Sequence, residues 1–166
     1  MKLPDNYDIR FSEASDLRFL EECFADRQER VPFPFETDKE TSDALKNWIG
    51  FAKYKASLTG IIANQPCAVG TLFLMPYRKV SHHAAFYLIV EPSLRRKGIG
   101  TSMVRNLMHL AKTRFRLEGL HAEMFDPCAL VSVLSKQNFE IYAKQDNFAH
   151  IEGQGRARIL MEFFFS

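Results

Sequence analysis

The segment IVEPSLRRKGIGTSMV, from Ile89 to Val104, contains the residue types needed to bind an oxyanion through the main chain. The apolar run that leads into it, residues 84–90, is typical of a strand buried on both faces of a sheet. Two glycines follow, Gly98 and Gly100, and an apolar pattern at helical spacing begins directly after them. The sequence therefore predicts a strand, a glycine turn and a helix in immediate succession.

A helix that begins at such a turn presents several N–H groups without intrahelical acceptors at the positive end of the helix dipole. Because Gly98 and Gly100 lack a Cβ atom, a bulky anion such as a diphosphate can approach the main chain closely. Arg95, Arg96 and Lys97 add positive charge beside the turn. We therefore expect a phosphate-binding site here.

The spacing of the glycines distinguishes among the known phosphate-binding motifs. A Walker loop requires a lysine before its Ser or Thr, but here Thr101 directly follows Gly100. A dinucleotide fingerprint requires a third glycine where Met103 stands. The hexapeptide that begins at Arg95 instead matches Arg/Gln-x-x-Gly-x-Gly/Ala, and it resembles the acetyl-CoA pyrophosphate loop of the GNAT superfamily of N-acetyltransferases.

The resemblance extends over nearly the whole chain. It includes the opening IRFSEASDLRFL, a hairpin around Asn64-Gln65-Pro66 and the segment SKQNF. It implies acetyl-CoA as co-substrate and no metal, with main-chain groups of the central strand on the pantetheine arm and thioester, and the glycine turn on the pyrophosphate. The cofactor-binding residues implied in this way are Leu88, Ile89, Val90, Arg95, Arg96, Lys97, Gly98, Ile99, Gly100 and Thr101.

Periodicity along the chain predicts an α+β fold. The expected order is strand, helix, helix, three strands, helix, strand, helix and two strands, with the second helix beginning at Thr41 or Ser42. The resemblance implies a GNAT-like mixed central sheet of about six to seven strands flanked by about four helices. Because the chain has no repeat, linker or low-complexity tract, we expect residues 1–166 to form a single N-acetyltransferase domain.

The residues that many family members use for proton transfer are absent. The resemblance places a general base at the position of Ala84 or Phe86, and a general-acid tyrosine at the position of Leu134. His83, at the start of the central strand, and Glu123, on the neighbouring strand, are weak substitutes. The sequence therefore leaves the identity of the catalytic acid and base open.

Cys128, Ser132 and Tyr142 are the other polar side chains expected within reach of the cofactor sulfur. A covalent route through Cys128 is disfavoured, because no histidine lies nearby in the sequence to activate it. Holding the amine next to the thioester provides effective molarities of about 10⁵ M or more, whereas general acid–base assistance typically raises the rate by about 10²- to 10⁴-fold. We therefore expect direct attack by the amine in a ternary complex.

Two functions follow from these observations. The leading hypothesis is an acetyl-CoA-dependent N-acetyltransferase that acts on a primary amine of a small molecule, peptide or protein. The alternative, suggested by Ala84, Phe86 and Leu134, is a catalytically weak or inactive CoA-binding module of the same fold. The resemblance implies that residues 27–41 and 141–158 select the acceptor, and neither stretch carries a readable signature.

Composition indicates which binding partners and which cellular compartment to expect. A formal charge of +2 is too small to imply a polyanion partner. Residues 95–116 contain seven basic side chains and no acidic one, which would suit a nucleic-acid binder, but the stretch lacks aromatic interleaving, so we expect no nucleic-acid partner. The three cysteines are too few and too widely spaced for a disulfide framework or a metal site, which indicates a reducing compartment. No apolar run has the length of a signal peptide or a membrane span, so we expect a cytoplasmic protein without a membrane partner. The apolar stretch at residues 158–165 suggests an edge strand and a homodimer formed through it.

Overall fold

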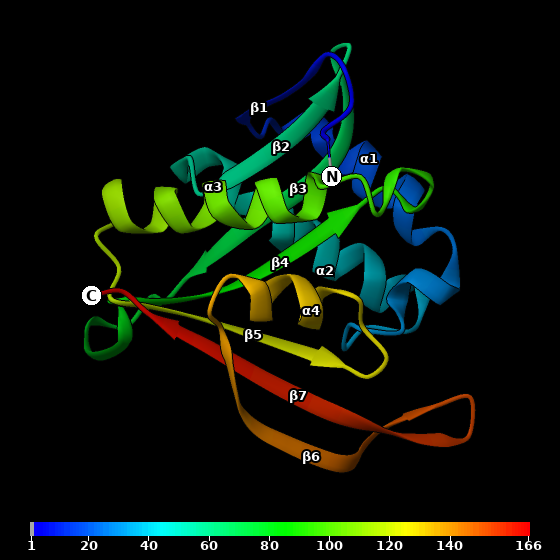
Figure 1. The fold of residues 1–166 in the computed structure, drawn as a ribbon. Coiled ribbons are helices and arrows are strands. Elements are labelled where there is room, and N and C mark those ends of the chain that lie inside the picture. The colour runs from blue at the N-terminus through cyan, green and yellow to red at the C-terminus, as the bar shows by residue number, and fades with distance from the viewer. Residues whose placement is uncertain (1) are drawn as a thin grey trace.

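The computed structural model describes residues 2–166. These residues form a seven-stranded mixed sheet in the order β1-β2-β3-β4-β5-β7-β6, with four α-helices packed against it (Figure 1). The predicted α+β class and element order are confirmed. The elements are β1 (Tyr7–Phe11), α1 (Leu17–Phe24), α2 (Asp38–Gly50), β2 (Ser57–Ile62), β3 (Gln65–Leu74), β4 (His83–Val90), α3 (Ile99–Thr113), β5 (Gly119–Phe125), α4 (Leu130–Lys136), β6 (Glu140–Ile151) and β7 (Gln154–Phe164). None of the helices described is long and apolar enough to cross a membrane.

The central strand, β4, pairs differently with its two neighbours. Its antiparallel pairing with β3 runs from Ala84 to Val90. Its parallel pairing with β5 is limited to His83↔Gly119, Ala84↔Leu120 and Ala85↔His121. The two strands then part, so the second half of β4 has no backbone partner on the β5 side.

Two apolar cores hold β4 from opposite faces of the sheet. On one face, α3 and α4 bury Met103 and Leu107 against residues that include Leu88. On the other face, α1 and α2 bury Trp48 in a cluster that includes Ile89. Figure 1 shows α3 and α4 in front of the sheet and α2 behind it. The alternation of side chains along a strand explains why neighbouring residues of β4 belong to different cores.

Helix α2 begins at Asp38, earlier than the predicted start at Thr41 or Ser42. The hydroxyl of Thr37 accepts a hydrogen bond from the Glu40 N–H at 3.1 Å, and the Glu40 carboxylate accepts one from the Thr37 N–H at 3.1 Å. This reciprocal capping box satisfies two N–H groups that would otherwise lack acceptors, and it places the helix start before the first apolar residue.

The stretch at residues 158–165 lies largely in β7, which pairs with β5 on one side and with β6 on the other. The prediction of an edge strand there is therefore wrong, because the β6–β7 hairpin folds so that its second strand lies beside β5. The sheet edges are β1 and β6. The argument for a homodimer through this stretch loses its physical basis.

A cluster of buried polar side chains joins the start of α1 to β1 and β2. Asp16 accepts two hydrogen bonds from Arg10, at 2.8 and 2.9 Å, and one from the Thr59 hydroxyl at 2.8 Å. The Glu13 N–H donates to the same carboxylate at 2.9 Å. Burial alone would raise the pKa of Asp16, but these hydrogen bonds and the charge of Arg10 together hold it below its ordinary value.

We expect Asp16→Asn to lower the free energy of unfolding at pH 7 by about 1–3 kcal/mol, the usual cost of leaving buried donors poorly paired. Because the folded-state pKa is depressed, the ionised carboxylate contributes stability above the unfolded pKa of ~3.9, and this contribution is lost as the pH falls through the folded pKa. Urea unfolding at several pH values measures the difference. The difference in unfolding free energy between wild type and Asp16→Asn should become smaller at acidic pH. The control is Asp43→Asn, at an exposed carboxylate on α2, which should neither lower the unfolding free energy at pH 7 nor change its pH dependence.

Candidate active site

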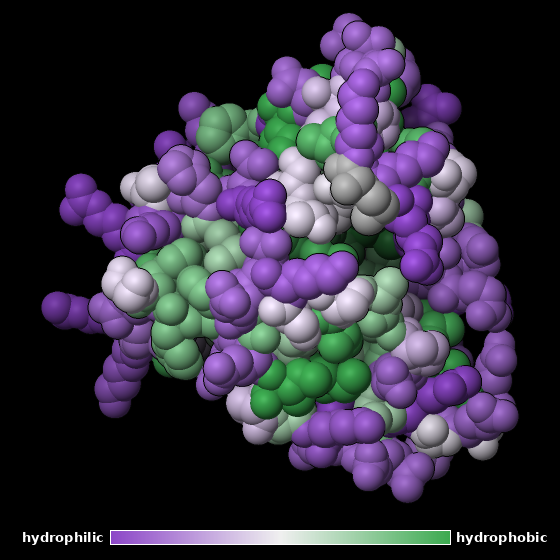
Figure 2. Space-filling view, viewed as in Figure 1, coloured by the Kyte–Doolittle hydropathy of each residue, from purple (hydrophilic) through white to green (hydrophobic). Residues whose placement is uncertain are grey.

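A cavity of about 310 Å³ opens where β4 and β5 part. Residues 86–90 of β4 and residues 122–124 of β5 form its walls, together with parts of α4 and the loop that leads into α3. Pro32 and Phe33, from the segment between α1 and α2, close a further side. Figure 2 shows apolar side chains gathered around α4 on this face, bordered by polar residues. A mostly apolar cavity with one basic loop suits a ligand that has an apolar arm and an anionic end.

The basic loop ends in a cradle of N–H groups. Helix α3 begins at Ile99, directly after Gly98, whose φ of 84° lies in the left-handed region that glycine adopts without strain. The Ser102 N–H donates to the Gly98 carbonyl at 3.1 Å, so the helical N–H groups before it have no intrahelical acceptor. A Cβ atom added to Gly100 would have no neighbour closer than Val90 Cγ2 at 3.9 Å. The turn thus leaves free space that is lined by backbone N–H donors.

The structure brings most of the predicted cofactor-binding residues to one cavity. Those that line it are Leu88, Ile89, Val90, Arg95, Arg96, Gly98, Gly100 and Thr101. Two others do not: the Ile99 side chain is 1% exposed within the core, and Lys97 is exposed outside the cavity. Any contribution from Ile99 is therefore limited to its main chain.

Arg95 connects the basic loop to the opposite wall of the cavity. Its guanidinium pairs with the Glu29 carboxylate, which lies on a short 3₁₀ helix, Arg27–Arg30, after α1. Its Nε donates to the Val90 carbonyl at 3.2 Å. The Glu29 side chain is 15% exposed and the Arg95 side chain is 38% exposed, so solvent reaches this pair mainly from the arginine side. An anionic ligand at the turn would compete with Glu29 for the Arg95 guanidinium.

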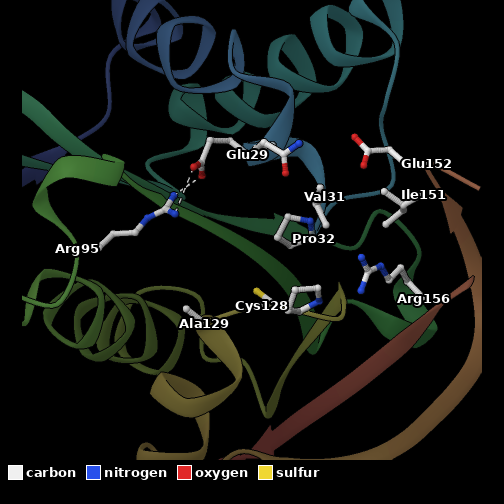
Figure 3. A pocket seen from close by; sticks show the side chains of 11 residues that line it. Glu29, Val31, Pro32, Arg95, Cys128, Ala129, Ile151, Glu152 and Arg156 are labelled. Carbon is white, nitrogen blue, oxygen red and sulfur yellow. Dashed lines mark hydrogen bonds and ion pairs between the residues drawn. The ribbon is translucent and has the colours of Figure 1, made fainter. Parts of the chain in front are cut away.

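A second cavity, of about 260 Å³, adjoins the first (Figure 3). We call it the side chamber. The short helix after α1, the loop after β5 and the β6–β7 turn enclose it. The two cavities share the residues Glu29, Pro32, Arg95, Cys128 and Ala129. These five residues form a shared wall between the two cavities. A ligand in the side chamber therefore lies next to this wall of the first cavity.

The two catalytic candidates from the sequence lie apart. Glu123 lines the first cavity, but its carboxylate accepts hydrogen bonds from Arg158 at 3.0 and 3.2 Å. His83 is the first residue of β4, at the closed end of the strand pair, and it does not line the cavity. Its ring lies 4.2 Å from that of His82 and 5.8 Å from that of Phe164. The geometry thus gives no support to His83 as the base.

The positions of the usual acid and base are apolar and buried. Ala84 and Leu134 are 0% exposed and Phe86 is 2% exposed. Among the other candidates, Ser132 lines the first cavity but donates to the Ala129 carbonyl at 3.1 Å. Tyr142 is half exposed on β6 and lies outside both cavities.

Two cavity groups are held in their neutral forms. Burial raises the pKa of the Cys128 thiol above its ordinary value, and it outweighs the opposing hydrogen bonds and the charge of Arg95. Burial, with a smaller effect from Glu123, raises the pKa of Tyr87 to about 12. Sequence reasoning missed Tyr87 because it appears as one more apolar residue of a buried strand. It also missed Glu29 and Arg156, which reach the cavities from distant segments and carry no local signal.

Among residues 2–166, no group of three or more His, Cys, Asp or Glu is arranged to hold a metal ion.

Comparison with known proteins agrees with this geometry. The model of the acetyltransferase (GNAT) family matches residues 18–127. A GNAT superfamily phosphinothricin acetyltransferase from Sinorhizobium meliloti, solved in complex with acetyl-CoA, has a TM-score of 0.82 at 14% identity, over 97% of this chain and 89% of that chain. A ribosomal-protein-alanine N-acetyltransferase from Brucella melitensis has a TM-score of 0.78 at 18% identity, over 95% and 99% of the two chains.

A GNAT family acetyltransferase from Streptococcus pneumoniae is similar to the same extent, with a TM-score of 0.78 at 17% identity over 96% of this chain and 99% of that chain. A search of curated proteins found no match. The family match covers well over half of the sequence, and the fold is that of solved family structures. The chain therefore belongs to the acetyltransferase (GNAT) family.

Proposed function

We propose that this protein transfers the acetyl group of acetyl-CoA to a primary amine. The observation that carries the proposal is the continuity of one cavity, in which the unpaired half of β4 leads directly to the N–H cradle at the start of α3. This arrangement suits a long ligand with amide groups along an arm and a diphosphate at its end. The acetyl-CoA complex of a protein with the same fold supports it.

The main chain supplies most of the binding groups in this proposal. The N–H groups from Gly98 to Thr101 hold the diphosphate, and Arg96 adds positive charge beside them. Arg95 stays paired with Glu29 and contributes its charge from the edge of the loop. The free edge of β4, at Leu88 and Val90, pairs with the amides of the pantetheine arm. The apolar walls then keep water away from the thioester.

The reaction proceeds by direct attack in a ternary complex. The neutral amine nitrogen forms a bond to the thioester carbon, the C–S bond breaks, the amine loses one proton and the departing CoA sulfur gains one. Main-chain donors of β4 stabilise the oxyanion that forms between these steps. The two acidic side chains in the cavity, Glu29 and Glu123, are both paired with arginines, so water accepts the amine proton.

The alternative is a CoA-binding module with little catalysis, favoured by the apolar residues Ala84, Phe86 and Leu134 at the usual acid and base positions. It predicts that acetyl-CoA binds but that no amine accelerates CoA release. Among the structures of this fold are a phosphinothricin acetyltransferase and a ribosomal-protein-alanine N-acetyltransferase, so enzymes named for different acceptors share this fold.

We expect Gly100→Glu to weaken acetyl-CoA binding by about 100-fold or more, because placing like charges together costs several kcal/mol. The site has room for a Cβ atom, so the fold should persist. Isothermal titration calorimetry with acetyl-CoA measures the effect. Gly50→Glu is the matched control, because Gly50 also has helical geometry and open space but lies at the end of α2. Equal affinity in the two variants would contradict the assignment of the cradle.

The rate of acetyl transfer should rise with pH as the acceptor amine loses its proton, toward ~8 for an α-amine and toward ~10.4 for a lysine-like amine. This is expected if water, and no side chain, accepts the proton. Initial rates of CoA release from pH 6 to pH 10, at saturating acetyl-CoA, test it. A bell-shaped profile with a limb that disappears in His83→Gln would instead identify a protein base.

Cys128→Ala should retain acetyl transfer within a few-fold, because direct attack needs no acetyl-cysteine intermediate and burial keeps this thiol protonated. Steady-state rates of wild type and variant decide the point. A loss of about 10³-fold or more, together with an acetylated Cys128 in intact-mass spectra of the wild type, would establish a covalent route.

A further inference from the structure

The side chamber contains an arginine that has no hydrogen-bond or ion-pair partner among residues 2–166. Arg156, near the start of β7, lines this cavity, and Figure 3 shows its guanidinium inside it, apart from the carboxylate of Glu152. Its Nε is buried and makes no hydrogen bond with any of residues 2–166. None of the ion pairs formed among residues 2–166 includes Arg156.

Other sheltered arginines of this protein are compensated. Arg158, two residues later, pairs with Glu123, and Arg30 donates to the Phe24 carbonyl at 2.9 Å and pairs with Asp38 at 3.0 Å. A buried guanidinium N–H without an acceptor carries a desolvation cost. Arg156 is thus an exception that an anionic ligand would explain.

The charges around Arg156 leave it free for such a ligand. The chamber has two carboxylates: Glu29 is engaged by Arg95, and Glu152 is exposed on the β6–β7 turn. The planar guanidinium matches a carboxylate, which it can hold through two parallel hydrogen bonds. The part of the chamber that borders the first cavity is the wall formed by the five shared residues, which include Cys128 and Ala129.

We infer that the acceptor is a small amine that also carries a carboxylate, such as an amino acid, and that Arg156 binds this carboxylate. The inference rests on the proposed function, because it places the acceptor's amine at the shared wall beside the acetyl group. The chamber volume of about 260 Å³ lies just below the range of ~300–1,000 Å³ typical of pockets for drug-sized ligands. It fits a single amino acid better than a folded protein surface.

The test is a matched panel of acceptors. CoA release from acetyl-CoA is measured with the proteinogenic L-amino acids, their carboxamides, their decarboxylated amines and short peptides with free N-termini. At least one free amino acid should have kcat/KM about 10- to 100-fold above that of its carboxamide, the range expected for a charge-assisted bidentate contact. Arg156→Gln should remove this preference mainly by raising KM, and Arg156→Lys should restore part of it.

Arg78→Gln, at an exposed position outside both cavities, is the control and should keep the preference. Equal or better turnover of carboxamides, amines or peptides would overturn the inference, as would a preference that survives Arg156→Gln. Calorimetry with acetyl-CoA on the same proteins separates the two proposals. Normal cofactor binding without turnover of any free amino acid would refute the acceptor assignment, whereas failure to bind acetyl-CoA would refute the proposed function beneath it.

Discussion

The parting of β4 and β5 after three residue pairs is the constraint on which the rest of the molecule depends. A continuous sheet would satisfy the main chain of β4 on both sides and leave no space between the strands. Because the pairing stops, main-chain groups of β4 stay available and a cavity forms between the strands. Helix α3 begins just beyond the end of β4, which places its free N–H groups at one end of that cavity.

The two apolar cores hold this open arrangement in place. Leu88 is buried in the core beneath α3, and its neighbour Ile89 is buried in the core around Trp48, so β4 is held from both faces while one edge is free. The Arg95–Glu29 pair then joins the loop after β4 to the segment after α1. Both members of this pair line the side chamber as well as the first cavity, so the basic loop forms part of the wall between them.

Features encoded by neighbouring residues were predictable, and features made by distant residues were not. The glycine turn, the element order and the buried central strand follow from local patterns, and the structure contains them. The pairing of Glu123 with Arg158, the entry of Glu29 and Arg156 into the cavities, and the interior position of β7 all depend on how the β6–β7 hairpin and the segment after α1 fold back. His83 was plausible from the sequence because its place in β4 does not reveal which end of that strand borders the cavity.

The N–H cradle at the start of α3 also bears on how such a protein can change over evolutionary time. A binding site made of main chain requires only that a few positions stay small and that proline is excluded where an N–H donates, since every other residue presents the same N–H group. The side chamber, in contrast, is lined by side chains, and a single substitution there alters its charge. Under the proposed function, the diphosphate end of the site therefore tolerates far more sequence change than the acceptor end, in a fold that solved structures share with this chain at only 14–18% identity.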